Sequence, residues 1–352
     1  MADFLIGARR IKPGYHAVPA RQCSKRRFGW VPRRGRRGPR AARFVLLARG
    51  MNPGVLPFYF ERNVIYIGMV DTVLEDRLGP GGYDPGLYPS GKRWDLVKGF
   101  ENVSDAMIAR FHRDGFLAIE GAFFQSQVDA GLSAISDLID GEIPDFRGVQ
   151  FEKGLRKAVA EKTGQERQSG VRKLNRFIGY DKRLDQFAES AGLLNTLGRI
   201  FEKPPTLFRD QAMLKPARVG REKPWHQDLA YFDLPLETCV VSVWIALDEA
   251  TPENGCMHVI PGSHREGPVV HFRRRDWQIC DAHVAPDRAV SVALPPGGIL
   301  LWHGMLHHGT PANRSDESRR ALQLHFIPEG VDETPQGDRL AIFGSEGKDV
   351  TC

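Results

Sequence analysis

Two residues of the segment Trp225-His226-Gln227-Asp228 have side chains that bind metals. In an extended strand, residues i and i+2 point to the same face. His226 and Asp228 would therefore present an imidazole and a carboxylate side by side. Two histidines and one carboxylate form the facial triad that binds non-haem Fe(II) and leaves coordination positions open. Because His-x-Asp occurs by chance in many chains, the assignment depends on a third ligand elsewhere.

A histidine-rich segment further along the chain offers three candidates for that ligand: His303, His307 and His308. His307 and His308 are adjacent, so in an extended chain they would point to opposite faces. Arg319 follows His308 after eleven residues. A guanidinium can form a bidentate pair with a carboxylate, and so it could hold the far carboxylate of 2-oxoglutarate. Two histidines and a carboxylate also suit zinc, but a zinc hydrolase gives no reason for Arg319.

The elements that must position these residues change in character along the chain. Apolar spacing predicts helices over 105–111, 125–138 and 184–201, with Ser104 as the cap of the first. Beyond Phe201 the pattern favours short strands separated by Gly, Pro, Asn and Asp. The predicted strands cover 116–119, 212–215, 240–247, 257–260, 290–294, 299–303 and 321–327. Helices followed by an antiparallel double-layered sheet indicate a β-sandwich or barrel.

The charge of the chain is unevenly distributed. The 352 residues carry a net charge of +6, but residues 1–50 alone carry +13 and the remainder −7. The basic character therefore belongs to the start of the chain, and we expect no nucleic-acid partner for the body. No run of 18 apolar residues is present, so no transmembrane segment is predicted.

We predict three parts: an Arg-rich, largely disordered or irregular extension over 1–98, a catalytic domain over 99–330 and a C-terminal tail over 331–352. The first 50 residues could be a targeting segment, a basic binding arm or an extension without a folding role. Five scattered cysteines without a Cys-x-x-Cys pair predict neither a disulfide framework nor a cysteine zinc site. We therefore expect a reducing compartment and a cytoplasmic location.

Four separated segments resemble the phytanoyl-CoA dioxygenase family. They are His226-Gln227-Asp228-Leu229, Asn254-Gly255-Cys256-Met257, Pro261-Gly262-Ser263-His264, and His308-Gly309 followed by Asn313 and Arg319. The resemblance covers roughly 103–329, and the order and spacing of four motifs are more specific than any one of them. It implies a mainly β fold with helical decoration around a double-stranded β-helix (jelly roll, cupin-like) core. It also implies Fe(II), 2-oxoglutarate and O2.

The resemblance also implies roles for individual residues. His226, Asp228 and His308 match the iron ligands, and the His-Gly-x-x-x-Asn phrase selects His308 over its neighbours. Arg319 matches the arginine that anchors 2-oxoglutarate. Further matches to the co-substrate pocket are Trp244, Gln227 and, more loosely, Lys173 and Met213.

The implied activity is hydroxylation of a C–H bond in a small-molecule or lipid-like substrate, with release of succinate and CO2. Desaturation or ring closure would use the same site, whereas Asp228 argues against the halogenating branch of such enzymes. The competing hypothesis is a non-catalytic jelly-roll binding module. The run 273–275, three arginines, reads either as a solvated loop face or as a contact for an anionic substrate. The sequence does not name the substrate.

Overall fold

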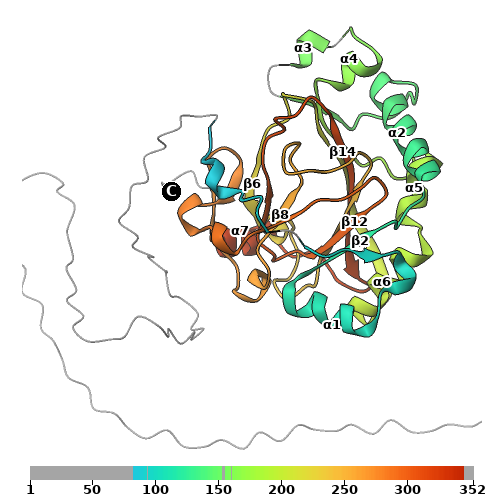
Figure 1. Cartoon of the computed structure of the whole chain (residues 1–352). Helices are drawn as coiled ribbons and strands as arrows, with labels where there is room; N and C mark the ends of the chain where they lie inside the picture. Colours follow the sequence, from blue (N-terminus) through green and yellow to red (C-terminus); the bar gives the residue numbers. More distant parts are fainter. Residues whose placement is uncertain (1–81, 93, 153–154, 160, 345–352) are drawn as a thin grey trace, which may run out of the picture. The chain divides into compact units, whose positions relative to one another are not determined.

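The computed structural model describes residues 82–92, 94–152, 155–159 and 161–344, which form two facing sheets covered by helices on one side (Figure 1). The larger sheet has the strand order β1-β2-β12-β7-β14-β5-β4-β3. In that order its strands are Val97–Lys98, Phe116–Glu120, Ile299–His303, Val241–Ala246, Arg319–Pro328, Pro205–Lys215, Val171–Asn175 and Val149–Phe151. All neighbours in it pair antiparallel except β1 and β2.

The smaller sheet has the order β11-β8-β13-β6, and a separate hairpin consists of β9 and β10. Its strands are β11 Val290–Val292, β8 Met257–Val259, β13 His308–Thr310 and β6 Lys223–His226, and the hairpin is β9 His271–Arg273 with β10 Trp277–Ile279. Trp244 and Leu300 of the larger sheet pack with Val259 and Val292 of the smaller one in one buried cluster. Two antiparallel sheets closed over a shared core confirm the predicted mainly β jelly roll.

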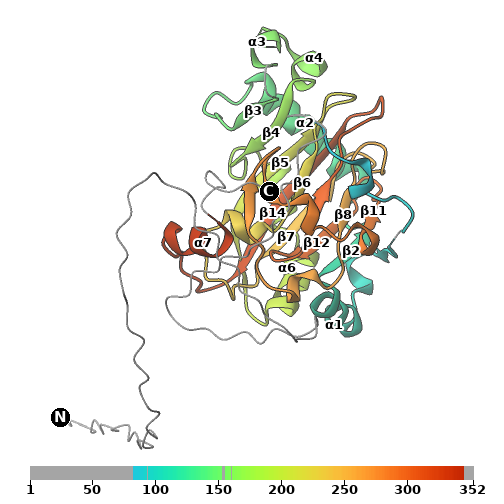
Figure 2. The same ribbon diagram turned by 90° about the vertical axis from the view of Figure 1, so that its left-hand side faces the viewer.

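Helices cover the outer face of the larger sheet (Figures 1 and 2). They are α1 Asp105–Asp114, α2 Gln125–Asp140, α5 Lys182–Ala188 and α6 Ala191–Phe201, with short helices α3 Arg156–Val159 and α4 Gly164–Gln168 near the edge strands. Helix α7, Gln336–Phe343, does not belong to this layer, and its Phe343 packs with Leu229 and Ala230 in a separate cluster. Strand positions that alternate with the inner residues, such as Val243 and Ile245, pack against these helices. The helices therefore pack against the outer face of the larger sheet and restrict its motion.

The predicted helices over 105–111 and 125–138 are present as α1 and α2, each slightly longer. The single predicted helix over 184–201 is wrong, because the chain breaks before Ser190 into α5 and α6. The Ser190 hydroxyl accepts a hydrogen bond from the backbone N–H of Leu193 and begins α6. Both helices bury apolar residues against the same core. The spacing of these apolar residues in the sequence therefore resembles that of one continuous helix.

The predicted part boundaries stay a prediction, since residues 1–81 lie outside the described residues. Residues 82–98 are largely irregular, as expected, but they pack on the fold: Leu87 and Tyr88 are buried, and the Tyr88 ring stacks on Trp225 of β6 at 5.5 Å. The predicted tail contains α7, whose Phe343 is buried. Single buried aromatic residues such as Tyr88 and Phe343 do not repeat at helical or strand spacing, so the sequence does not reveal that they are buried. Cys280 is disulfide-bonded, whereas Cys239 and Cys256 are free thiols, so these cysteines form no multi-bridge framework among the described residues.

Candidate metal centre and co-substrate pocket

Three predicted metal ligands lie together in the interior of the jelly roll. Strand β6 ends at His226, Gln227 stays extended with φ −113° and ψ 130°, and the 3-10 helix η3 (Asp228–Tyr231) begins at Asp228. Strand β13 pairs with β6 so that His308 lies opposite His226. The Nε2 atoms of both histidines are 3.5 Å from Oδ1 of Asp228. One donor atom from each residue lies within 4.8 Å of the others, which is a spacing that could hold a metal ion.

Backbone carbonyls fix the orientation of both imidazoles. The Nδ1 atom of His226 is 2.7 Å from the carbonyl oxygen of Pro224, and that of His308 is 2.9 Å from the carbonyl oxygen of Leu306. A carbonyl only accepts, so each Nδ1 carries the proton and donates it. Each Nε2 is left with a free lone pair directed at the third residue. This is the tautomer that a metal ligand needs.

The carboxylate of Asp228 is held by three residues of the larger sheet. Its Oδ2 accepts hydrogen bonds from Ser242 Oγ at 2.6 Å and Trp302 Nε1 at 2.9 Å. The Ser242 hydroxyl gives its proton to Asp228, so the Nδ1–H of His325, at 2.8 Å, donates to Ser242. With Oδ2 occupied in this way, Oδ1 is the oxygen that faces His226 and His308. The arrangement prepares Asp228 to bind a metal through one oxygen.

The charge states of these residues suit a divalent cation. Burial lowers the pKa of His226 to about 4, so its imidazole is neutral at pH 7. Burial alone would raise the pKa of Asp228, but His308 and His226 beside it hold that pKa well below its usual range. The neutral imidazole of His226, the ionised carboxylate of Asp228 and the Nε2 atom of His308 together form the donor set of a non-haem iron site.

The other two histidines of the segment lie elsewhere. His307 is buried just before β13 begins, and its backbone N–H donates to Ser263 Oγ at 2.8 Å. The His303 ring packs against His264 at 5.2 Å, and its Nδ1 accepts from the backbone N–H of Met305. Neither of them lines the cavity at His226. The geometry therefore places His308, and not its neighbours, with His226 and Asp228.

A cavity of about 890 Å³ connects these residues with Arg319. Arg319 begins β14 and is 1% exposed, and its guanidinium lies 5.1 Å from the centre of the Trp244 ring. Among the described residues, none accepts a hydrogen bond from its Nε or Nη1 atom. The nearby Asp248 pairs with Arg320 instead. Burial lowers the pKa of Arg319 to about 10, so it remains charged. A buried cation with unsatisfied donors beside a cavity fits the carboxylate of a bound ligand.

The remaining predicted pocket residues have different outcomes. Trp244, Lys173 and Met213 line the cavity. Gln227 does not, and its prediction as a co-substrate contact is wrong. Its amide donates to the carbonyl oxygens of Gly267 and Met305 and accepts from the backbone N–H of Val269. Because alternation turns it away from His226 and Asp228, Gln227 fastens the neighbouring loop instead.

Sequence reasoning missed the residues that support Asp228. Ser242 lies opposite Trp302 on β12 and opposite His325 on β14, so pairing of three strands brings them together. His325 is buried and also lines the cavity. The only available signal was alternation within each predicted strand, which cannot give the register between strands.

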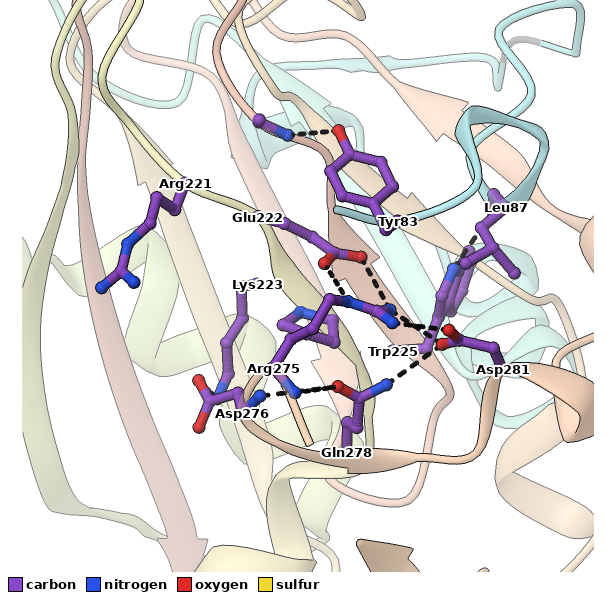
Figure 3. A network of polar contacts seen from close by, with 12 residues as sticks. Tyr83, Leu87, Arg221, Glu222, Lys223, Trp225, Arg275, Asp276, Gln278 and Asp281 are labelled. Carbon is purple, nitrogen blue, oxygen red and sulfur yellow. Dashed lines mark hydrogen bonds and ion pairs between the residues drawn. The ribbon is translucent and has the colours of Figure 1, made fainter. Parts of the chain in front are cut away.

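A polar network fastens the β9–β10 hairpin to β6 beside the site (Figure 3). Arg275 bridges Glu222 at 2.7 Å and Asp281 at 2.6 Å, while Lys223 pairs with Asp276 at 2.8 Å. Gln278 joins the same network by donating to Asp281. Arg274 and Arg275 both line the cavity, but Arg275 is neutralised by Glu222 and Asp281 and so has a structural role.

A jelly roll with an enclosed His-Asp-His cluster and a buried arginine defines an Fe(II)- and 2-oxoglutarate-dependent dioxygenase, with O2 as the second co-substrate. The model of the phytanoyl-CoA dioxygenase family matches residues 111–321, and the chain belongs to this family. None of the helices in the described part of the chain is long and apolar enough to cross a membrane.

Known proteins agree with this class. "Phytanoyl-CoA dioxygenase domain-containing protein 1" of Danio rerio is 24% identical over 268 residues, which cover 64% of this chain and 90% of that protein. The non-haem alpha-ketoglutarate-dependent carbocyclase SnoK from nogalamycin biosynthesis shares the fold with a TM-score of 0.55 and 19% identity, over 72% of this chain and 98% of its own. EvdO2 from Micromonospora carbonacea var. aurantiaca, complexed with 2-oxoglutarate, is 25% identical with a TM-score of 0.51, over 66% and 93% of the two chains.

Proposed function

We propose that this dioxygenase hydroxylates a C–H bond of a small molecule, with His226, Asp228 and His308 as its iron ligands. Arg319 binds the C5 carboxylate of 2-oxoglutarate in this proposal. The observation that carries it is the buried Arg319, whose free donors face the same cavity as the His-Asp-His cluster. A zinc hydrolase or an empty binding module gives no reason to bury this unpaired cation.

When bound, Fe(II) and 2-oxoglutarate supply the oxidising chemistry: one atom of O2 enters succinate as CO2 leaves, and the other becomes the substrate hydroxyl. The protein itself orients the metal ligands and shields the co-substrate site from water. Trp302 and Ser242 donate hydrogen bonds to Oδ2 of Asp228, so that only Oδ1 is available to bind the metal. Trp244 covers the guanidinium of Arg319 and keeps water from it, which strengthens the pair with a carboxylate.

The predicted wall residues Met213 and Lys173 complete the co-substrate side of the cavity in this proposal. Met213 lies opposite Lys173 on β4 and opposite Ala321 on β14, two residues beyond Arg319. Substrate enters from the other side, where Tyr231 and Phe232 line the cavity. Hydroxylation remains the proposed outcome, and product analysis distinguishes it from desaturation or ring closure, which would leave the substrate without a new oxygen.

Metal-dependent decarboxylation of 2-oxoglutarate tests the proposal without knowledge of the substrate. The apoprotein is reconstituted with Fe(II) or Zn(II), and CO2 from 1-labelled 2-oxoglutarate is measured during uncoupled turnover. We expect CO2 release with Fe(II) only, and its loss in His308→Ala. His307→Ala is the matched control, because His307 is the adjacent histidine that does not line the cavity. Release supported by Zn(II), or retained by His308→Ala, would contradict the proposed site.

A cytoplasmic location is also proposed, and it rests on the scattered cysteines in the sequence. The disulfide at Cys280 argues in the other direction. Thiol labelling of the native protein before and after reduction tests this point. A free Cys280 thiol agrees with a reducing compartment, and an oxidised one contradicts it.

A further inference from the structure

The cavity is strongly positive in a protein whose body is negative. Nine Lys or Arg residues line it, against four Asp or Glu residues, whereas residues 51–352 carry a net charge of −7. Concave sites lined by one sign of charge attract ligands of the opposite sign. The lining includes a single leucine and neither valine nor isoleucine. Such a surface suits a compact charged molecule better than the long hydrocarbon chain of a lipid.

Most of the lining cations already have partners. Lys223 pairs with Asp276, Arg275 with Glu222 and Asp281, and both Arg172 and Arg221 with Glu152. Lys215 donates to backbone carbonyls, including that of Arg221, and Arg274 has an interaction of its own. Arg319 is assigned to 2-oxoglutarate. The charges of Fe(II), the Asp228 carboxylate, the 2-oxoglutarate dianion and Arg319 sum to zero. These four groups therefore leave no net negative charge that another lining cation could neutralise.

Two lining cations remain, Lys173 on β4 and Arg209 on β5. Within the described chain, neither is joined to another residue by a hydrogen bond or an ion pair. Lys173 faces the cations Lys223, Arg172 and Arg209, with Asp276 as the opposing carboxylate. Burial and these cations lower its pKa to about 8, which leaves it charged at pH 7. Like charges gathered around a cavity repel one another, and an anion between them relieves this repulsion.

Arg209 lies at the metal end of the cavity. It stands opposite His325 on β14, the residue that supports Ser242 and thereby Asp228. Arg319 is six residues from His325 along the same strand, about 20 Å at the usual rise of a β-strand. The guanidinium of Arg209 rests on the ring of Phe232 at 5.0 Å, which restricts its direction but leaves its N–H donors free. It is therefore positioned beside the place where a substrate would meet the metal.

We propose that the substrate is a compact molecule with an anionic group, a carboxylate or a phosphate, which Arg209 binds at the metal end of the cavity. Lys173 adds to the positive field from the co-substrate side. This inference rests on the proposed function, because it requires the substrate to occupy the same cavity. It replaces the lipid-like substrate among the sequence-based expectations. Arg209 is a specificity residue in this proposal, and the metal and co-substrate bind without it.

Phenylacetate, phenyl phosphate and the neutral phenylacetamide are suitable probes, because Tyr231 and Phe232 offer aromatic contacts for their rings. Each probe is added anaerobically to full-length protein loaded with Fe(II) and 2-oxoglutarate. Binding is followed by equilibrium dialysis and by the change in the visible absorption band of the chelate. We expect at least one anion to bind about 10-fold to 100-fold more tightly than the amide, the range of a charge-assisted hydrogen bond.

Arg209→Gln should remove this preference and leave the 2-oxoglutarate affinity unchanged. Arg176→Gln is the matched control, because Arg176 is exposed, lies near Arg209 and does not line the cavity. It removes the same charge and should retain the preference. Phenylacetate and phenyl phosphate separate a carboxylate substrate from a phosphate substrate.

The inference would be overturned by equal binding of the amide and both anions, by an unchanged preference in Arg209→Gln, or by an equal loss of preference in Arg176→Gln. A weakened 2-oxoglutarate affinity in Arg209→Gln would also overturn it, because Arg209 would then serve the co-substrate. A missing absorption band in wild type would count against the proposed function. Dialysis of the probes would still decide whether Arg209 forms an anion site.

Discussion

Replacement of Arg319 by methionine should both stabilise the protein and strongly weaken its binding of 2-oxoglutarate. Without ligand, Arg319 is a buried cation whose Nε and Nη1 lack partners among the described residues. An unsatisfied buried donor costs about 1–3 kcal/mol, and more when it is charged. Methionine fills similar space beside Trp244 without burying charge. For a folded body of this size, 1 kcal/mol corresponds to about 2–4 °C, so we expect the Tm of Arg319→Met to rise by about 2–12 °C.

Although Arg319→Met should be more stable without ligand, 2-oxoglutarate should stabilise it less than it stabilises wild type. Saturation of wild type with 2-oxoglutarate at about 100 times its Kd stabilises the protein by about 2.7 kcal/mol. Loss of a buried bidentate pair costs about 2–5 kcal/mol, which weakens affinity by about 30-fold to 4,000-fold. At ligand concentrations that saturate wild type, Arg319→Met should therefore retain at most about a third of the wild-type stabilisation, and essentially none at the upper end of this range. The assay is thermal unfolding with Mn(II) as a redox-stable metal, with and without 2-oxoglutarate.

Arg320→Met provides the control for this experiment. Arg320 is the next residue, pairs with Asp248 at 2.8 Å and does not line the cavity. A partly exposed pair contributes about 0–1 kcal/mol, so this variant should lose a little stability and keep the ligand response. An Arg319→Met protein that is less stable than wild type and still stabilised by 2-oxoglutarate would refute the reasoning.

Three further predictions concern the metal ligands, their support and the anion site. His308→Ala should lose tight Fe(II) binding, whereas His307→Ala should retain it within a few-fold; metal titration followed by dialysis measures both. Ser242→Ala and Trp302→Phe each remove one hydrogen bond from Asp228, so iron affinity should fall by about 10-fold to 100-fold in each, and an unchanged affinity would show that Asp228 needs no such support. The pKa of Lys173 is lowered to about 8, so its charge is present below that pH and lost above it. Anion affinity should therefore weaken between pH 7 and pH 9 in wild type but not in Lys173→Met, and equal pH profiles would exclude Lys173 from the anion site.

The sequence predicted those parts of the site that lie within one segment or carry a motif. The spacing of His226 and Asp228 is preserved because Gln227 is extended, although the strand ends before Asp228. Strand β12 has the predicted bounds 299–303, because a continuous apolar run between turn residues leaves little choice. Asn313 orders the loop before Arg319 by donating to the carbonyl oxygen of Glu317, as its place in the motif indicates.

Contacts between distant segments could not be predicted in this way. The register that joins Ser242, Trp302 and His325 under Asp228 depends on three strands from separate parts of the chain. Tyr88 reaches Trp225 across the fold from a segment without periodicity. The pocket cations read as unrelated surface charges in sequence, and only the fold shows that Lys173 and Arg209 share a cavity.

The most direct test of the account is an anaerobic titration of the purified full-length protein with Fe(II) and 2-oxoglutarate. The visible charge-transfer band of the chelate reports metal and co-substrate in one complex. The account predicts a band that saturates at one iron per chain in wild type, disappears in His308→Ala, persists in His307→Ala and requires far more 2-oxoglutarate in Arg319→Met. A folded, zinc-free wild type that binds Fe(II) without this band, or a band that survives in His308→Ala, would contradict it.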